Sequence, residues 1–177
     1  MGKLIHISVI DHSSPELGFN GSNILLFCFW ISFSAGGRNE AYAQIGHGGR
    51  SAKGNFGLVD VDGDGSADGD ITAVATGSVL FSAGSANQTY AQLGHGGYDA
   101  DAITTAGNTS NTGNILVEST VGDIIFNAAG SNGINSYVQL GHGGMNTYGD
   151  FSGSITARAY DGAVEFTAGE HDDRYAQ

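Results

Sequence analysis

The sequence is poor in positive charge, cysteine and proline, and the first two shortages exclude whole classes of protein. Its 177 residues include 6 Lys and Arg against 18 Asp and Glu, which gives a formal net charge of −12. Nucleic acids and anionic membranes need a positive protein surface, so neither is expected as a partner. One cysteine, Cys28, cannot form an internal disulfide, which excludes a disulfide-stapled scaffold but fits both cytosolic and bacterial surface proteins.

A long apolar run and a secretory leader are also missing. The most apolar stretch, residues 24–33, is shorter than the roughly 20 residues that a helix needs to cross a bilayer. Lys3 is the only basic residue among the first 37, and no small-residue cleavage site follows an apolar core. We therefore expect no signal peptide here and no membrane insertion by this segment.

Glycine is abundant, with 30 residues, and many of them fall in a phrase that recurs along the chain. The phrase Tyr-[Ala/Val]-Gln-[Ile/Leu]-Gly-His-Gly-Gly occupies residues 42–49, 90–97 and 137–144, and Tyr-Ala-Gln returns at 175–177. Self-similarity at this period predicts a stacked repeat architecture. Because the fourth copy is only begun, we expect the sequence to be a fragment of a longer protein.

Each repeat joins a constant core to an insertion of variable length. The phenylalanines Phe33, Phe81, Phe126 and Phe166 anchor the repeats at intervals of 48, 45 and 40 residues, and most of the variation follows Gly-His-Gly-Gly. Solenoids accept such insertions as loops on one face. The chain divides into an amino-terminal segment, residues 1–20, and repeats at about 21–68, 69–112, 113–152 and 153–177, the last truncated.

The start of the chain departs from this pattern. Residues 24–33 take the place of a repeat, yet their outward positions are apolar as well. Three hypotheses stay open: a cap covered by residues 1–20, a sticky end that docks on a preceding coil, or an artefactual start of the gene. An exposed apolar edge of this kind would favour aggregation.

Within the core, apolar residues recur with the period of two that is typical of strands. Residues 71–75 and 79–83 show this alternation, and in the phrase Ala91 and Leu93 share one face while Tyr90 and Gln92 share the other. No stretch has helical spacing, so the prediction is all-β: a parallel β-solenoid of the right-handed β-helix type, with about four stacked repeats and variable loops on one side. One three-sided coil per repeat is favoured, and two shorter coils are the alternative.

The core rhythm resembles a known family. Gly-[Asp/Asn/Ser]-Ile, a short strand, a glycine turn and [Val/Ile]-x-Phe-x-Ala, as at residues 69–83, are similar to the repeats of filamentous-haemagglutinin-like exoproteins. These are large right-handed β-helical adhesins exported by two-partner secretion or as autotransporters. The resemblance covers roughly residues 21–177, although neither the family's amino-terminal secretion domain nor an outer-membrane barrel is identifiable in this sequence.

The resemblance carries functional expectations. It implies a non-catalytic shaft or binding segment of a large bacterial adhesin or fibrous exoprotein, located outside the cell or on its surface. Glycans, surface proteins or neighbouring solenoids are the partners it suggests.

The clearest chemical motif lies in the first insertion, Asp-Val-Asp-Gly-Asp-Gly-Ser-Ala-Asp-Gly-Asp at residues 60–70. Alternating oxygen ligands and a glycine for the bend match the opening of a calcium loop, which makes calcium the one cofactor suggested. Ile71 stands where an EF-hand has its closing glutamate, so a looser calcium loop and a solvated acidic turn both stay open. The candidate ligands are Asp60, Asp62, Asp64, Ser66 and Asp68.

The repeated histidines, His47, His95 and His142, should form a column with rungs about 4.8 Å apart. Zinc needs ligands that converge on one point, whereas identical residues along an axis lie on successive rungs. We therefore favour a structural ladder at a corner, each imidazole bonded to loop backbone, over a metal site. A second structural ladder is expected from the four anchor phenylalanines.

The tyrosines and glutamines of the phrase are expected to face outward. Such a row could stack sugar rings or pack against another solenoid, although support of the stacked strands is the favoured role. The candidates for surface binding are Tyr42, Tyr90, Tyr137, Gln44, Gln92 and Gln139.

Catalysis is not expected. Parallel β-helices include polysaccharide lyases and hydrolases, which gather Asp with Arg or Lys on one face, and such a carbohydrate-active enzyme is the main alternative. Here Arg50, Arg158 and Arg174 occupy unrelated repeat positions, and no nucleophile-base set or phosphate loop stands out. A calcium-dependent binding module is a third hypothesis.

Overall fold

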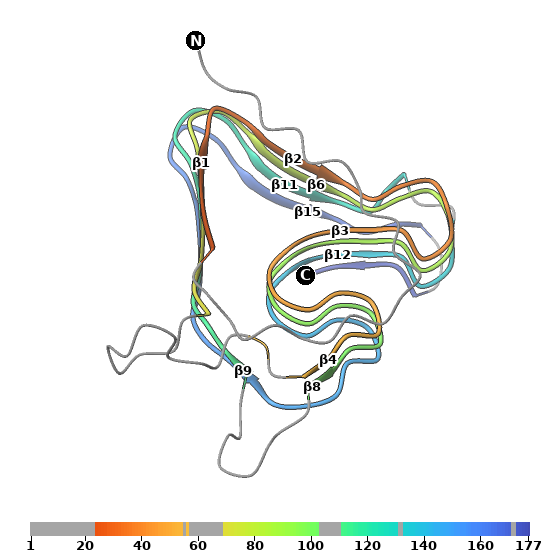
Figure 1. Ribbon diagram of the computed structural model, residues 1–177. Coiled ribbons are helices and arrows are strands. Elements are labelled where there is room, and N and C mark those ends of the chain that lie inside the picture. The colour runs from red at the N-terminus through yellow and green to blue at the C-terminus, as the bar shows by residue number, and fades with distance from the viewer. Residues whose placement is uncertain (1–23, 55, 57–68, 103–110, 131–132, 171–172) are drawn as a thin grey trace.

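The computed structural model describes residues 24–54, 56, 69–102, 111–130, 133–170 and 173–177, and the regular elements in these ranges are all β-strands (Figure 1). Most of them belong to three four-stranded parallel sheets. The first sheet holds β1 (Ile24–Cys28), β5 (Ile71–Ala75), β10 (Ile115–Ser119) and β14 (Ile155–Ala159). The second holds β2 (Ile31–Ser34), β6 (Val79–Ser82), β11 (Ile124–Asn127) and β15 (Val164–Thr167). The third holds β3 (Tyr42–Ile45), β7 (Tyr90–Leu93), β12 (Tyr137–Leu140) and β16 (Tyr175–Ala176).

Each sheet takes one strand from every repeat, so one repeat makes one coil. The registers place like on like: Ile24 pairs with Ile71, Phe33 with Phe81, and Tyr42 with Tyr90. Parallel strands stacked in three sheets are the arrangement of a parallel β-solenoid, and the prediction of an all-β stacked fold is confirmed to that level. Two shorter coils per repeat do not occur in the described ranges.

The interior of the coil is built from the inward positions of all three sheets. The period-two pattern places Ile71, Ala73 and Ala75 inside together with Val79 and Phe81, and all of these are fully buried. The anchor phenylalanines stack with nearly parallel rings at centroid distances of 5.3, 4.9 and 5.0 Å. Because each ring covers its neighbours, no single repeat could bury its own core.

Polar side chains bridge the coils at the corners before the first and second strands. Asp70 Oδ1 accepts the Asn114 N–H at 2.6 Å, and Asn114 Oδ1 accepts the Ser154 N–H at 3.0 Å. At the next corner Asp123 Oδ1 accepts the Ala163 N–H at 2.9 Å. The Asp and Asn of the Gly-[Asp/Asn/Ser]-Ile rhythm thus satisfy backbone donors that the turns leave outside the sheets.

After β3, β7 and β12 of the third sheet the chain doubles back on itself (Figure 1). We call these segments the hooks: residues 46–54, 94–102 and 141–152. The hooks stack on one another and carry the short pairs β4 (Lys53–Gly54) with β8 (Asp101–Ala102) and β9 (Asn111–Thr112) with β13 (Phe151–Ser152), the strand β9 standing just outside the second hook. A small separate core of Ala52, Phe56 and Ala100, with Phe151 against it, lies among them.

The first coil exposes apolar side chains on its outer face. Leu25 and Phe27 on β1 are 63% and 65% exposed, and Phe29 and Trp30 at the following corner are each 52% exposed. In the next coil the positions paired with Leu25 and Phe27 are Thr72 and Val74. The hypothesis that residues 1–20 cover this segment falls outside the described residues.

Candidate functional site

The Gly-His-Gly-Gly turn is where the third strand meets the hook, and each glycine there has a steric reason. Gly94 has φ +149°, and a Cβ on it would overlap the carbonyl group of Gly141 in the next coil. A Cβ on Gly97 would lie 2.7 Å from the hydroxyl of Tyr90. Side chains at these positions would therefore push the coils or the tyrosine column apart.

The histidine of the turn closes the coil. The Nε2–H of His95 donates to the carbonyl of Gly69 (2.5 Å), at the start of the same coil, and its Nδ1 accepts the His47 N–H at 2.9 Å. His142 repeats this pattern, with its Nε2 2.7 Å from the Gly113 carbonyl and its Nδ1 3.1 Å from the His95 nitrogen. Both ring nitrogens are used, which assigns the neutral Nε2–H tautomer.

Burial disfavours the charged form of these rings. Desolvation lowers the pKa of His95 to about 3, and the neighbouring His142 adds to the effect. The pKa of His142 is lowered as well, again chiefly by burial. The imidazoles stack with centroids 5.0 and 4.8 Å apart, so a second positive charge in the column would face the first.

The column joins coils and does not converge on a point. Its rings lie parallel on successive rungs, while a metal site needs several donors aimed at one centre. Among the described residues no group of three or more His, Cys, Asp or Glu is placed to hold a metal ion. The candidate calcium ligands Asp60, Asp62, Asp64, Ser66 and Asp68 lie outside the described residues.

The tyrosines and glutamines of the phrase lie on the outer face of the third sheet, but the prediction that they are available for surface binding is wrong for the inner coils. Tyr90, Tyr137 and Gln92 are fully buried, and Gln139 is 2% exposed. The hook folds over the outer face of the third sheet, and its residues Tyr98 and Met145 pack on the tyrosine column. The two end coils leave Tyr42, Gln44 and Tyr175 partly exposed and Gln177 exposed, but the inner coils are covered, so the column offers no continuous surface for a ligand.

The glutamines hold the turns in place from inside the hook. Gln92 Nε2 donates to the carbonyls of His95, Gly141 and Gly143 at 3.0–3.1 Å. The first carbonyl belongs to the turn of its own coil, and the other two belong to the turn of the next coil. Gln44 makes two such bonds, to Gly94 and Gly96. Each amide thus ties two coils together at the point where the hook leaves the sheet.

Replacing Gln92 with leucine should destabilise the protein by about 2–3 kcal/mol, because a buried donor to three carbonyl groups is lost. Gln44→Leu is the matched comparison: the position is equivalent, partly exposed and bonded to two carbonyls, so a smaller loss is expected. Urea denaturation of both variants measures the difference. Equal effects would mean that the amide bonds do not contribute as the contacts indicate.

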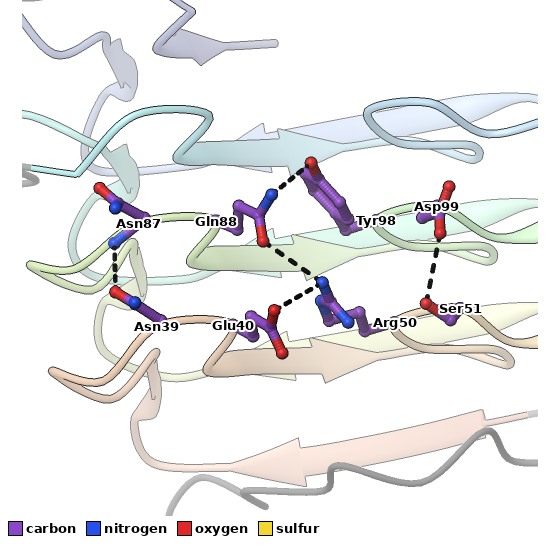
Figure 2. Close-up of polar contacts among 8 residues, drawn as sticks. All are labelled: Asn39, Glu40, Arg50, Ser51, Asn87, Gln88, Tyr98 and Asp99. Atoms are coloured by element: carbon purple, nitrogen blue, oxygen red, sulfur yellow. Dashed lines mark hydrogen bonds and ion pairs between the residues drawn. The ribbon is translucent and has the colours of Figure 1, made fainter.

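A polar cluster that the sequence did not suggest joins the first two hooks to the coil (Figure 2). Arg50 pairs with Glu40 at 2.9 Å and donates to Gln88 Oε1 at 3.3 Å, while Gln88 Nε2 donates to the Tyr98 hydroxyl at 2.9 Å. The Arg50 guanidinium also lies 5.4 Å from the centre of the Tyr98 ring. Figure 2 shows two parallel rungs beside it, Asn39 with Asn87 and Ser51 with Asp99.

The residues of this cluster occupy equivalent positions in the first two repeats. Glu40 and Gln88 stand two residues before the tyrosine of their copies, and Arg50 and Tyr98 directly follow Gly-Gly. Both members of the first pair have a left-handed backbone, with φ of 68° and 57°. These positions carry different residues in the two copies, unlike the constant phrase between them. The sequence could have indicated a contact between them only if the hook had been known to fold back onto the coil.

The described surface also contains an apolar depression of about 250 Å³ at the first coil, lined by Ile24, Leu26, Phe33, Gln44, Ile45 and Gly46. These side chains include no acid, base or nucleophile.

No protein-family model, curated protein or solved structure matches the chain. Nor does the described part of the chain contain a helix long and apolar enough to span a membrane.

Proposed function

We propose that the chain is a non-catalytic shaft segment of a large bacterial extracellular adhesin or fibrous exoprotein, wound as a right-handed β-helix. The observation that carries this proposal is the continuity of its columns through the coils. Tyrosine rings follow one another at 5.0, 5.0 and 4.9 Å, and phenylalanine rings at closely similar distances. A chain built for one local chemistry has no need to repeat its turns, ladders and core in every coil.

A shaft gains length by adding coils, and this design permits it. Each coil contacts only its neighbours, so stability grows with the number of coil interfaces. The insertions differ in length from repeat to repeat, while the paired residues of the three sheets keep their register. Contacts with glycans, surface proteins or neighbouring solenoids would fall to these insertions and to the exposed apolar face of β1, because the tyrosine column is covered.

The experiment is to lengthen the chain and measure its shape. Duplicating residues 69–112 once and twice should extend the particle by about 4.8 Å per added repeat, with an unchanged cross-section in small-angle scattering. Antibody labelling of intact cells that make the parent protein should detect the segment at the surface. A particle that widens instead of lengthening would contradict the shaft, and release of sugars from a panel of polysaccharides would favour the enzyme alternative.

A further inference from the structure

We propose that His95 and His142 form an acid-operated latch: protonation of these two imidazoles opens the hooks locally, at the contacts between successive turns, while the main core stays folded. The inference starts from the position of these rings. They stand at the start of their hooks, directly after the strands of the third sheet, and each accepts the backbone N–H of the histidine in the preceding coil.

The hydrogen bonds of the latch permit only one protonation state. In the neutral form Nδ1 of His95 accepts the N–H of His47, and the Nε2–H reaches Gly69. A proton on Nδ1 would set an N–H donor against another N–H donor, which removes the bond between coils. The same holds for His142 and the His95 N–H, so each protonation opens a contact between two coils.

The surroundings of the column would not stabilise that charge. His95 is stacked between His47 and His142, and protonation of either neighbour adds repulsion over about 5 Å. On the side of the first sheet the ring meets Gly69 and Gly113. The adjacent carboxylate, Asp70, accepts the Asn114 N–H and so takes part in the corner ladder. The Phe151 ring lies 6.5 Å from His142 on the hook side.

Local opening is favoured because the hooks have their own connections. Successive hooks are joined by backbone bonds such as Ser51 N–H to Tyr98 O and Asp99 N–H to Met145 O, both 2.8 Å. Their ties to the coil are the histidine bonds to Gly69 and Gly113, the glutamine amides, the tyrosine packing and, for the first two hooks, the polar cluster around Arg50. Protonation removes the Nδ1 bonds between successive turns and places a charge on the buried His95 ring, whereas the Nε2–H bonds to Gly69 and Gly113 are kept. The hooks are therefore destabilised locally, and the phenylalanine column is untouched.

The direction of the pH effect follows from the pKa. The pKa of His95 is about 3 in the closed form and about 6.5 in an opened hook, so the latch acts fully above pH 6.5 and weakens as the pH falls toward 3. Between pH 7 and pH 5 the opening equilibrium should shift about 20-fold through His95 alone. Carboxylates with ordinary pKa values remain largely ionised over this interval, so a change in hook opening between pH 7 and pH 5 reports protonation of histidine.

Hydrogen exchange of the 177-residue chain at pH 7 and pH 5, corrected for intrinsic rates, tests the latch. Exchange in the hooks should rise about 20-fold, while β6 and β11 keep their protection. His95→Gln supplies a donor toward Gly69 without titrating, so this variant should show a much smaller rise, and His95→Asn, which also carries a neutral amide, serves if the first does not fold. Unchanged hook protection in the natural chain, or equal loss in hooks and core strands, would overturn the proposal.

Discussion

Gly94→Ala should destabilise the protein by about 4 kcal/mol or more. The backbone at Gly94 has φ +149°, which residues with a Cβ rarely adopt. The added carbon would also overlap the carbonyl of Gly141. Because that carbonyl belongs to the backbone of the next coil, the clash can be relieved only by separating two coils.

Gly130→Ala is the control for this prediction. Gly130 is exposed, its φ lies outside the left-handed region, and no heavy atom lies within 4 Å of the place a Cβ would take. Its substitution should change the free energy of unfolding by less than about 0.5 kcal/mol. Urea denaturation of the two variants compares them directly. If Gly94→Ala unfolded at the same urea concentration as Gly130→Ala, the close stacking at the turn would be refuted.

The stacked fold could be predicted because its determinants are local and repeated. The alternation of apolar and polar residues at 71–75 and 79–83 defines the inward face of two strands. The same residue types recur at equivalent positions of each repeat, which places the strands of successive repeats in register. The registers of Ile71 with Ile115 and of Phe81 with Phe126 follow directly. One coil per repeat was favoured on the same grounds, since each repeat contains three strand patterns and no more.

The surroundings of the third sheet could not be predicted in the same way. Alternation shows that Tyr90 and Gln92 lie opposite Ala91 and Leu93, but not what covers the face to which they point. A solenoid face is normally solvated, so an outward orientation implied exposure. The hook reverses that implication, and it depends on three glycines in a row of four residues, whose conformations a pattern of hydrophobicity does not report.

The partners of the histidines show a similar limit. A column could be expected from the period alone, and so could bonds to loop backbone. Gly69 and Gly113 could not be named as the acceptors, because they precede the first strand of the coil, 26 and 29 residues from the histidines they meet. Only closure of the coil brings these segments together.

Phe126→Ala should cost about 3–5 kcal/mol, because the ring is fully buried and lies between two other rings. Its centroid is 4.9 Å from that of Phe81 and 5.0 Å from that of Phe166. Removal leaves a cavity within a column, and neighbours held in register by three sheets cannot move along the axis to fill it.

Phe166→Ala gives the matched comparison, since the residue has the same repeat position and the same kind of neighbour on one side only. Its side chain is 41% exposed, so its removal loses less buried area and should cost about 1–2 kcal/mol. Thermal and urea unfolding of both variants give the two free energies. A ratio well above one would mean that stability resides in contacts between coils, which is the property a lengthening shaft requires. Equal costs would instead place the stability within each coil, and additional repeats would then add nothing to their neighbours.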